Sequence, residues 1–139
     1  MWTASLIVTV AALAAAGCGD SGPQRAPVTG QITWEGKPVE SGTISFMTSG
    51  TAESASASAP ITAGKYTIPE ESGPAVGANR VEILGNQSMG KKEAGPPFPP
   101  GTMIDDTKQV LPPIYNHASK LTADIKDGEN TVNFDLKPE

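Results

Sequence analysis

The segment Lys120-Leu-Thr-Ala-Asp-Ile-Lys126 alternates apolar and polar side chains, and Asp127-Gly-Glu-Asn130 and Thr131-Val-Asn-Phe-Asp-Leu136 follow it directly. Alternation with a period of two is the pattern of a β-strand that buries one face. Every second residue from 121 to 125, and again from 132 to 136, therefore belongs to an expected inner face. The Asp-Gly pair at 127–128 favours a tight turn between two strands. This stretch predicts a β-hairpin within an all-β fold.

The same period recurs from residue 28 onward. It predicts strands over 28–34, 42–47, 65–68 and 80–84, with turns at 35–38 and at Gly64, and a loop or weak edge strand over 51–59. The expected core consists of Val28, Ile32, Trp34, Ile44, Phe46, Tyr66, Ile68, Val81, Ile83, Leu121, Ile125, Val132, Phe134 and Leu136. No long helical period follows Ala16. About seven short strands joined by turns predict a two-sheet antiparallel β-sandwich.

The segment 85–113 departs from this alternation. It contains prolines at positions 96, 97, 99, 100, 112 and 113. Proline cannot donate a hydrogen bond to a β-ladder, so the segment is expected to be a long Pro-rich loop outside the sheet. A loop of this length in a small domain often carries a function.

Composition limits the classes of protein that need to be considered. The chain has 139 residues, which is the length of one domain, and a formal net charge of −5 without any basic run. An acidic surface disfavours nucleic acid as a partner. One Cys and one His exclude an internal disulfide framework and the common zinc sites. No metal or other cofactor is expected.

The first eighteen residues indicate export. Residues 6–16 form a short apolar run that suits the core of a signal peptide and falls short of the length needed to span a membrane. Ala15-Ala16-Gly17-Cys18 resembles the bacterial lipobox, which implies a signal peptide over 1–17 and lipid attachment to Cys18. Residues 18–26 then form a lipidated Cys and flexible tether before a domain over 27–139. The alternative is an ordinary secretory signal cut after Ala16, which leaves Cys18 as a free thiol.

The order of motifs in the mature chain is similar to that of a known family. Val28-Thr-Gly-Gln-Ile-Thr-Trp-Glu-Gly-Lys-Pro-Val39, Gly42-Thr-Ile-Ser-Phe46, Ala63-Gly-Lys-Tyr-Thr-Ile-Pro69 and Gly77-Ala-Asn-Arg-Val-Glu-Ile83 together resemble a carboxypeptidase-regulatory-like domain. The nearest likeness is to small bacterial lipoproteins that carry one such domain. The resemblance implies a transthyretin (prealbumin)-like β-sandwich, preceded by a signal-peptide helix, at the cell envelope. It implies no established activity.

The residues offer little for catalysis. His117 is the only candidate base, and it follows two prolines in a turn-like stretch where a solvated histidine is expected. Transthyretin-like hydroxyisourate hydrolases resemble one another through several His and Arg residues and a C-terminal Tyr-Arg-Gly-Ser, which this chain lacks. Carboxylates at 70–71, 105–106 and 124–129 are candidates for Ca²⁺, but none has the alternating spacing of a calcium loop. No catalytic residue is therefore predicted.

Binding surfaces remain. Phe98 lies between prolines on the Pro-rich segment, and it and Tyr115 are the candidate interaction residues, although Tyr115 is also expected to pack its ring against the sheet. Trp34 shares the parity of the inner face and is expected in the core. The sequence predicts a non-enzymatic, lipid-anchored extracytoplasmic module that contacts an envelope protein or polysaccharide. A carbohydrate-binding accessory domain is the alternative, and a small transthyretin-like hydrolase is a third. The sequence leaves the oligomeric state open.

Overall fold

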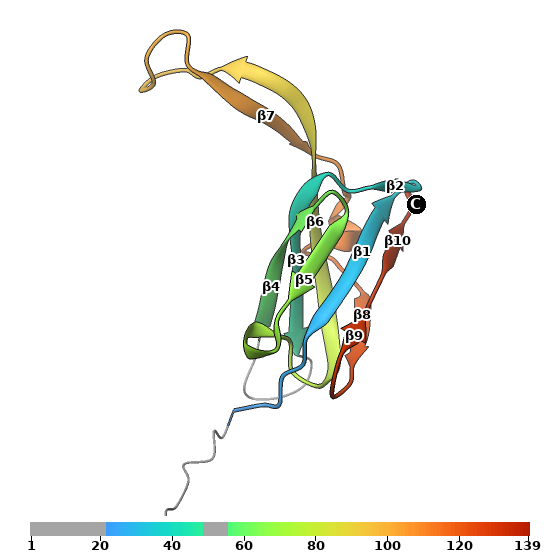
Figure 1. Ribbon diagram of the computed structural model, residues 1–139. Coiled ribbons are helices and arrows are strands. Elements are labelled where there is room, and N and C mark those ends of the chain that lie inside the picture. The colour runs from blue at the N-terminus through green and yellow to red at the C-terminus, as the bar shows by residue number, and fades with distance from the viewer. Residues whose placement is uncertain (1–21, 49–55) are drawn as a thin grey trace, which may run out of the picture.

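The computed structural model describes residues 22–48 and 56–139, which form an all-β structure with mostly antiparallel strands (Figure 1). The expected signal peptide and Cys18 lie outside the described residues, as does part of the stretch 51–59. The strands are β1 (Val28–Trp34), β2 (Lys37–Pro38), β3 (Ser41–Thr48), β4 (Ser56–Thr62), β5 (Lys65–Ile68), β6 (Gly77–Glu93), β7 (Met103–Gln109), β8 (Leu121–Ile125), β9 (Asn130–Thr131) and β10 (Phe134–Leu136). Two short 3-10 turns, η1 (Glu70–Ser72) and η2 (Pro113–Tyr115), complete the secondary structure of the described part.

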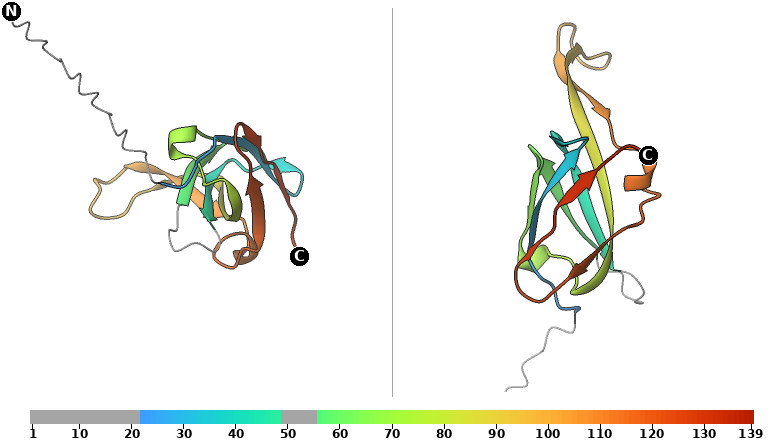
Figure 2. Two further views of the ribbon diagram at one scale, coloured as in Figure 1. Left: turned by 90° about the horizontal axis from the view of Figure 1, so that it is seen from below. Right: turned by 90° about the vertical axis from the view of Figure 1, so that its right-hand side faces the viewer.

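The strands form one hydrogen-bonded path in the order β10-β1-β5-β4-β3-β6-β7. Strands β2 and β9 also pair with β1, and β8 pairs with β6 beside the path. The link between β4 and β5 is thin, because Thr62 and Lys65 form their single registered pair, next to the turn at Ala63-Gly64. The views in Figure 2 show an elongated body of strands from which one ribbon projects.

The core confirms the inner faces that the alternation predicted. Ten of the expected residues are buried, namely Val28, Ile32, Ile44, Phe46, Tyr66, Ile68, Val81, Ile83, Ile125 and Leu136. Trp34, Leu121, Val132 and Phe134 are half-buried and pack against this core. The prediction missed Val39, Ile61 and Leu111, which are buried too. Ile61 lies in β4, which overlaps the stretch 51–59 that was expected to be a loop or weak edge strand; β4 is instead an interior strand between β5 and β3, with alternating burial.

The expected hairpin over 120–136 is wrong. Both segments are extended and have the predicted inner faces, but they do not pair with each other. Strand β8 pairs antiparallel with β6, whereas β9 and β10 pair in parallel with β1. The turn at Gly128 carries the chain from β6 to β1, so the segments before and after the turn pair with different strands. An Asp-Gly turn fixes a local reversal of the chain, and it does not fix which strand each arm of the turn meets.

The expected Pro-rich loop over 85–113 is also wrong. Strand β6 continues to Glu93 and pairs antiparallel with β7, from Asn86↔Gln109 to Glu93↔Met103. The prolines at 96–100 lie in the turn that joins these two strands, and those at 112–113 follow β7. Proline is excluded from the ladder itself, as the physical argument requires. The segment 86–109 is therefore a β-hairpin, here called the arm.

Tyr66 gives the core a predicted dependence on pH. Its ring is buried and its hydroxyl donates to the Val132 carbonyl oxygen at 2.7 Å, and burial raises the pKa of this phenol above its ordinary value. The folded state thus holds the proton more tightly than the unfolded chain, so this contribution to stability is complete below about pH 10 and falls as the pH rises further.

We expect Tyr66→Phe to lower the free energy of unfolding at pH 7 by about 1 kcal/mol, because one buried hydrogen bond is lost. The variant should also lose stability less steeply than the natural protein above about pH 10, since it has no phenol to ionise. Urea unfolding at pH 7 and pH 10.5 measures both effects. Equal pH slopes for the two proteins would contradict the prediction.

Candidate functional site

The arm has no core of its own. Residues 87–93 of β6 are all exposed, and in β7 only Asp106 is half-buried. Two ion pairs link its strands, Lys92 to Asp106 at 2.7 Å and Lys91 to Asp105 at 3.7 Å. Exposed pairs of this kind each contribute about 0 to 1 kcal/mol. A free two-stranded ribbon is only marginally stable in water, so the arm adds little to the stability of the fold. Its presence therefore points to a role other than stabilising the domain.

The charges and a bulge protect the edges of the arm. The ladder shifts register between Ser88 and Gly90, and Met89 is the extra residue at this bulge. Lys91, Lys92, Asp105 and Asp106 stand along the strands beyond it. Bulges and charged side chains are devices that prevent an exposed strand edge from pairing with another chain. The ribbon is thus less suited to adding a strand than to presenting its tip.

The tip of the arm, residues 94–102, is an ordered turn. The Ala94 amide donates to the Thr102 carbonyl oxygen at 2.7 Å, the Thr102 hydroxyl donates to the Pro99 carbonyl oxygen at 2.7 Å, and the Gly101 amide donates to a Glu93 carboxylate oxygen at 2.7 Å. Phe98 on this turn is 54% exposed, and Met103 next to it is equally exposed at 54%. Exposed apolar patches often mark contact sites, and Phe98 and Met103 are candidates for such a site at the end of the arm.

The arm points away from the N-terminal end of the described chain. In Figure 1 the described chain begins at the bottom of the body, where Arg25 pairs with Ala75 and Ala26 is buried, whereas β7 and the tip project from the top. Any attachment that precedes residue 22 therefore enters the domain at the end opposite the tip.

The base of the arm is joined to the body by specific contacts. A Glu40 carboxylate oxygen accepts from the Ser88 amide at 2.8 Å, and the Val110 amide donates to the Gly85 carbonyl oxygen at 2.9 Å. Leu111 is buried beneath this point and packs over Gly85, where an added Cβ would lie 2.8 Å from the leucine side chain. These contacts fix the direction in which the arm leaves the body.

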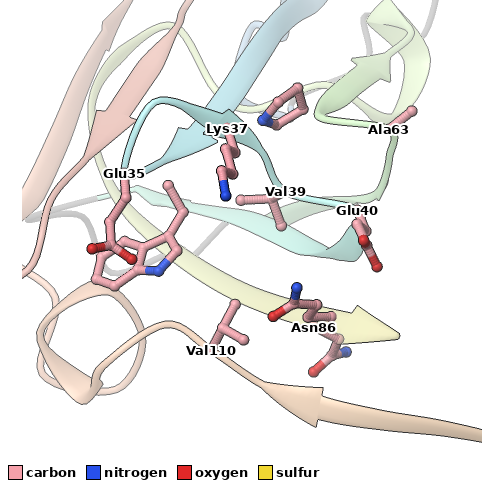
Figure 3. Close-up of a pocket in the computed structure, with 10 residues that line it drawn as sticks. Glu35, Lys37, Val39, Glu40, Ala63, Asn86 and Val110 are labelled. Carbon is pink, nitrogen blue, oxygen red and sulfur yellow. The ribbon is translucent and has the colours of Figure 1, made fainter. Parts of the chain in front are cut away.

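A cleft of about 780 Å³ lies beside this base (Figure 3). One wall is the segment 35–40 between β1 and β3, which contributes Glu35, Lys37 and Glu40, and the other is the start of the arm, which contributes Asn86 and Gln87. The turn after β1 is tight because Glu35 and Gly36 both have positive φ angles, of 51° and 79°, as expected for a two-residue hairpin turn. The geometry thus gathers five polar side chains from two distant parts of the sequence.

Trp34 also lines the cleft, and the Tyr115 ring packs against the Trp34 ring. The two rings meet edge to face, with centroids 6.1 Å apart and an interplanar angle of 76°. The Tyr115 hydroxyl donates to the Lys137 carbonyl oxygen at 2.6 Å, which holds the ring in place. Trp34 was expected in the core, and it lies at the core margin with part of its surface in the cleft. Tyr115 packs against the body, at a distance from the arm tip where Phe98 lies.

His117 and the carboxylates considered in the sequence do not come together in a site among the described residues. His117 is exposed, and the contacts found for it among the described residues use its backbone: its amide donates to Asn116, and its carbonyl oxygen accepts from Arg80. Neither the cleft nor a second hollow of about 300 Å³ beside β1 and β5 is lined by His117. Asp105 and Asp106 pair with lysines on the arm. Within residues 22–48 and 56–139 no group of three His, Cys, Asp or Glu side chains could hold a metal ion.

Sequence reasoning did not identify Glu40, Asn86, Gln87 or Val110 as site residues, and it interpreted 35–38 only as a turn. No local pattern brings positions 35–40 next to 86–87, because a β3–β6 pairing is needed for that. A helix long and apolar enough to cross a membrane is not found in the described part of the chain.

Comparison with known proteins gives no relative on which to rest a function. No protein-family model, no curated protein and no solved structure matches the chain.

Proposed function

We propose that this protein is a non-enzymatic interaction module of the cell envelope, anchored by lipid on Cys18, that contacts a partner protein through the tip of its arm. The observation that carries the proposal is the arm itself: an ordered turn with exposed Phe98, followed by exposed Met103 at the start of β7, at the end of the body opposite the described N-terminus. A membrane anchor at one end and a contact surface at the other suit a protein that reaches from a membrane toward a second component.

The chemistry of the tip favours a protein partner. Aromatic and Met side chains are enriched in the centres of protein interfaces, where a few such residues carry most of the binding free energy. Ile104, which is 37% exposed, follows Met103 in β7 and therefore presents a second apolar side chain on the opposite face of the ribbon. The hydrogen bonds within 94–102 order the backbone that presents Phe98 before binding, which lowers the entropic cost of association.

The fold assignment belongs to the same proposal. The all-β structure and the motifs in 28–83 agree with a carboxypeptidase-regulatory-like domain. The single registered pair between β4 and β5 would divide the path of strands into two layers, as a transthyretin-like sandwich requires. Small domains of this type at the envelope would act as scaffolds for contact.

The tip is tested by replacing Phe98 with a benzoyl-substituted, photo-crosslinking phenylalanine, which keeps an aromatic side chain at this position, in the full-length protein in its native membranes. We expect one dominant protein adduct, identified by mass spectrometry, and none when the same crosslinker replaces Glu71 in η1, which is exposed at the other end of the body. Phe98→Ala with a crosslinker at the exposed position 97 should reduce the adduct at least about tenfold, as the loss of a buried aromatic anchor implies. The same adducts from positions 98 and 71, or none from 98, would refute the role of the tip.

The anchor is tested separately. We expect Cys18→Ser to move the protein from the membrane fraction to the soluble fraction, because several acyl chains are needed for firm anchoring and this substitution removes their attachment point. Mass spectrometry of the natural protein should show an acylated N-terminal Cys18. A Cys18→Ser protein that stays in the membrane fraction, or an N-terminus at Gly17 with a free thiol at Cys18, would exclude the lipid anchor.

A further inference from the structure

We infer that the cleft at the base of the arm binds a neutral oligosaccharide. This site is distinct from the arm tip, and the inference stands whether or not the tip binds a protein. It rests on the aromatic ring, the polar groups and the charge that the turn after β1 and the start of the arm bring together around a hollow of about 780 Å³ (Figure 3). A volume of this size is typical of sites for small ligands.

The aromatic surface is positioned in advance. Trp34 is half-buried, and its edge-to-face contact with Tyr115 fixes the plane of its ring. The C–H face of a pyranose ring is apolar and packs against the face of an indole, while its hydroxyl groups point outward. Because both rings are already held, the binding of a sugar would not have to order them.

The polar groups of the cleft are free to bind hydroxyl groups. The side chains of Glu35, Asn86 and Gln87 make no hydrogen bond or ion pair with any described residue, and one Glu40 carboxylate oxygen accepts from Ser88. Carboxylates accept hydrogen bonds only, whereas carboxamides both donate and accept. Neighbouring sugar hydroxyls need donors and acceptors side by side, and this mixture supplies them.

The formal charge selects against anions. Glu35 and Glu40 contribute two negative charges and Lys37 one positive charge, so the cleft carries a formal charge of −1. The protein as a whole has a net charge of −5, which adds to the repulsion of a phosphate or a uronic acid. A neutral sugar suits the aromatic ring, the free polar groups and the negative formal charge of the cleft.

The test uses the protein with Trp2→Phe, so that Trp34 is its only tryptophan whether or not residues 1–17 have been removed. Its fluorescence and isothermal titration calorimetry are followed against neutral malto-, cello-, xylo- and N-acetylchito-oligosaccharides. Oligogalacturonate serves as the anionic probe, and a tri-alanine peptide as the alternative ligand. We expect at least one neutral oligosaccharide to saturate with a Kd on the order of 0.1 to 1 mM, since a shallow open site gives weak binding.

Matched variants assign the binding to the cleft. Gln87→Ala should weaken the affinity about tenfold, and Trp34→Phe, followed by calorimetry, should weaken it at least threefold, as loss of one hydrogen-bonding or stacking partner implies. Gln109→Ala removes the same type of side chain from the strand facing Asn86, outside the cleft, and should change the affinity less than about twofold.

Four results would overturn the inference. These are no saturation with any neutral oligosaccharide below about 10 mM, equal effects of Gln87→Ala and Gln109→Ala, tighter binding of oligogalacturonate, and preference for the peptide. None of them bears on the crosslink from position 98, so the two proposals fail independently.

Discussion

Gly30→Ala is expected to unfold the protein or to lower its free energy of unfolding by at least about 3 kcal/mol. Gly30 lies in β1, where the segment after β9 passes directly over it. A Cβ added at this position would lie 1.8 Å from the Val132 carbonyl oxygen and 2.9 Å from the Tyr66 ring. The nearest atoms are backbone, so rotation of a side chain cannot relieve the clash.

The clash that Gly30→Ala creates would also break two hydrogen bonds of Val132. The Val132 amide donates to the Thr29 carbonyl oxygen at 2.9 Å, and the Val132 carbonyl oxygen accepts from the Tyr66 hydroxyl at 2.7 Å. Moving the backbone at Val132 away from an alanine methyl group breaks both bonds and separates β9 from β1. The parallel pairing that holds the C-terminal segment to the body would thus be lost first.

Urea unfolding measures the effect, with Gly95→Ala as the matched control. An added Cβ at Gly95 meets no atom within 4 Å, and this glycine has no positive φ angle that would strain an alanine. We expect the control to unfold within about 0.5 kcal/mol of the natural protein. Equal midpoints for the two variants would show that the close approach of Val132 to Gly30 does not stabilise the fold.

Asn79→Ala is expected to lower the free energy of unfolding by about 2 to 4 kcal/mol, because it leaves buried acceptors without donors. Asn79 is fully buried in β6, at 0% exposure. Its Nδ2 donates to the Ala75 carbonyl oxygen at 2.8 Å and to the Gly77 carbonyl oxygen at 3.0 Å, and its Oδ1 accepts from the Thr48 hydroxyl at 3.5 Å. One amide thus ties the turn before β6 to the end of β3.

Asn133→Ala is the control for this prediction. Asn133 is exposed, and its Oδ1 accepts a single bond from the Gln31 amide at 2.9 Å. Water can replace that bond, so we expect a loss of about 1 kcal/mol or less. Thermal and urea unfolding of both variants should separate them clearly. A difference between them of under about 0.5 kcal/mol would mean that the buried network at Asn79 is not needed for stability.

The inner faces of the strands could be predicted because burial in a strand follows the local sequence. Ile44 and Phe46 in β3, and Val81 and Ile83 in β6, alternate with polar residues and are fully buried. A strand that covers a core on one side needs apolar residues at every second position, wherever its neighbours come from. The turn at Glu35-Gly36 was predictable for the same reason, since its backbone conformation depends on the turn residues themselves.

The arm could not be predicted, because both of its faces meet water. Neither 86–93 nor 103–109 needs an apolar face, so their sequences lack the alternation that identifies a strand. The six prolines at 96–113 favoured a loop, and four of them occupy the turn between the strands. Phe98 was identified as a candidate contact residue from its position among these prolines, but the ribbon that presents it required the ladder between β6 and β7.

The cleft shows the same division between local and distant interactions. The sequence contained Trp34 and the turn that follows it, while Asn86 and Gln87 reach the same hollow only because β6 pairs with β3. The failure of the expected hairpin over 120–136 has the same cause. The alternation of residues fixed which side chains of β8 and β10 turn inward, but the choice of β6 and β1 as their partners depended on contacts across the whole domain. Period and turn chemistry act over a few residues, whereas the pairing of strands is set by the total area buried and the hydrogen bonds satisfied when all of them assemble.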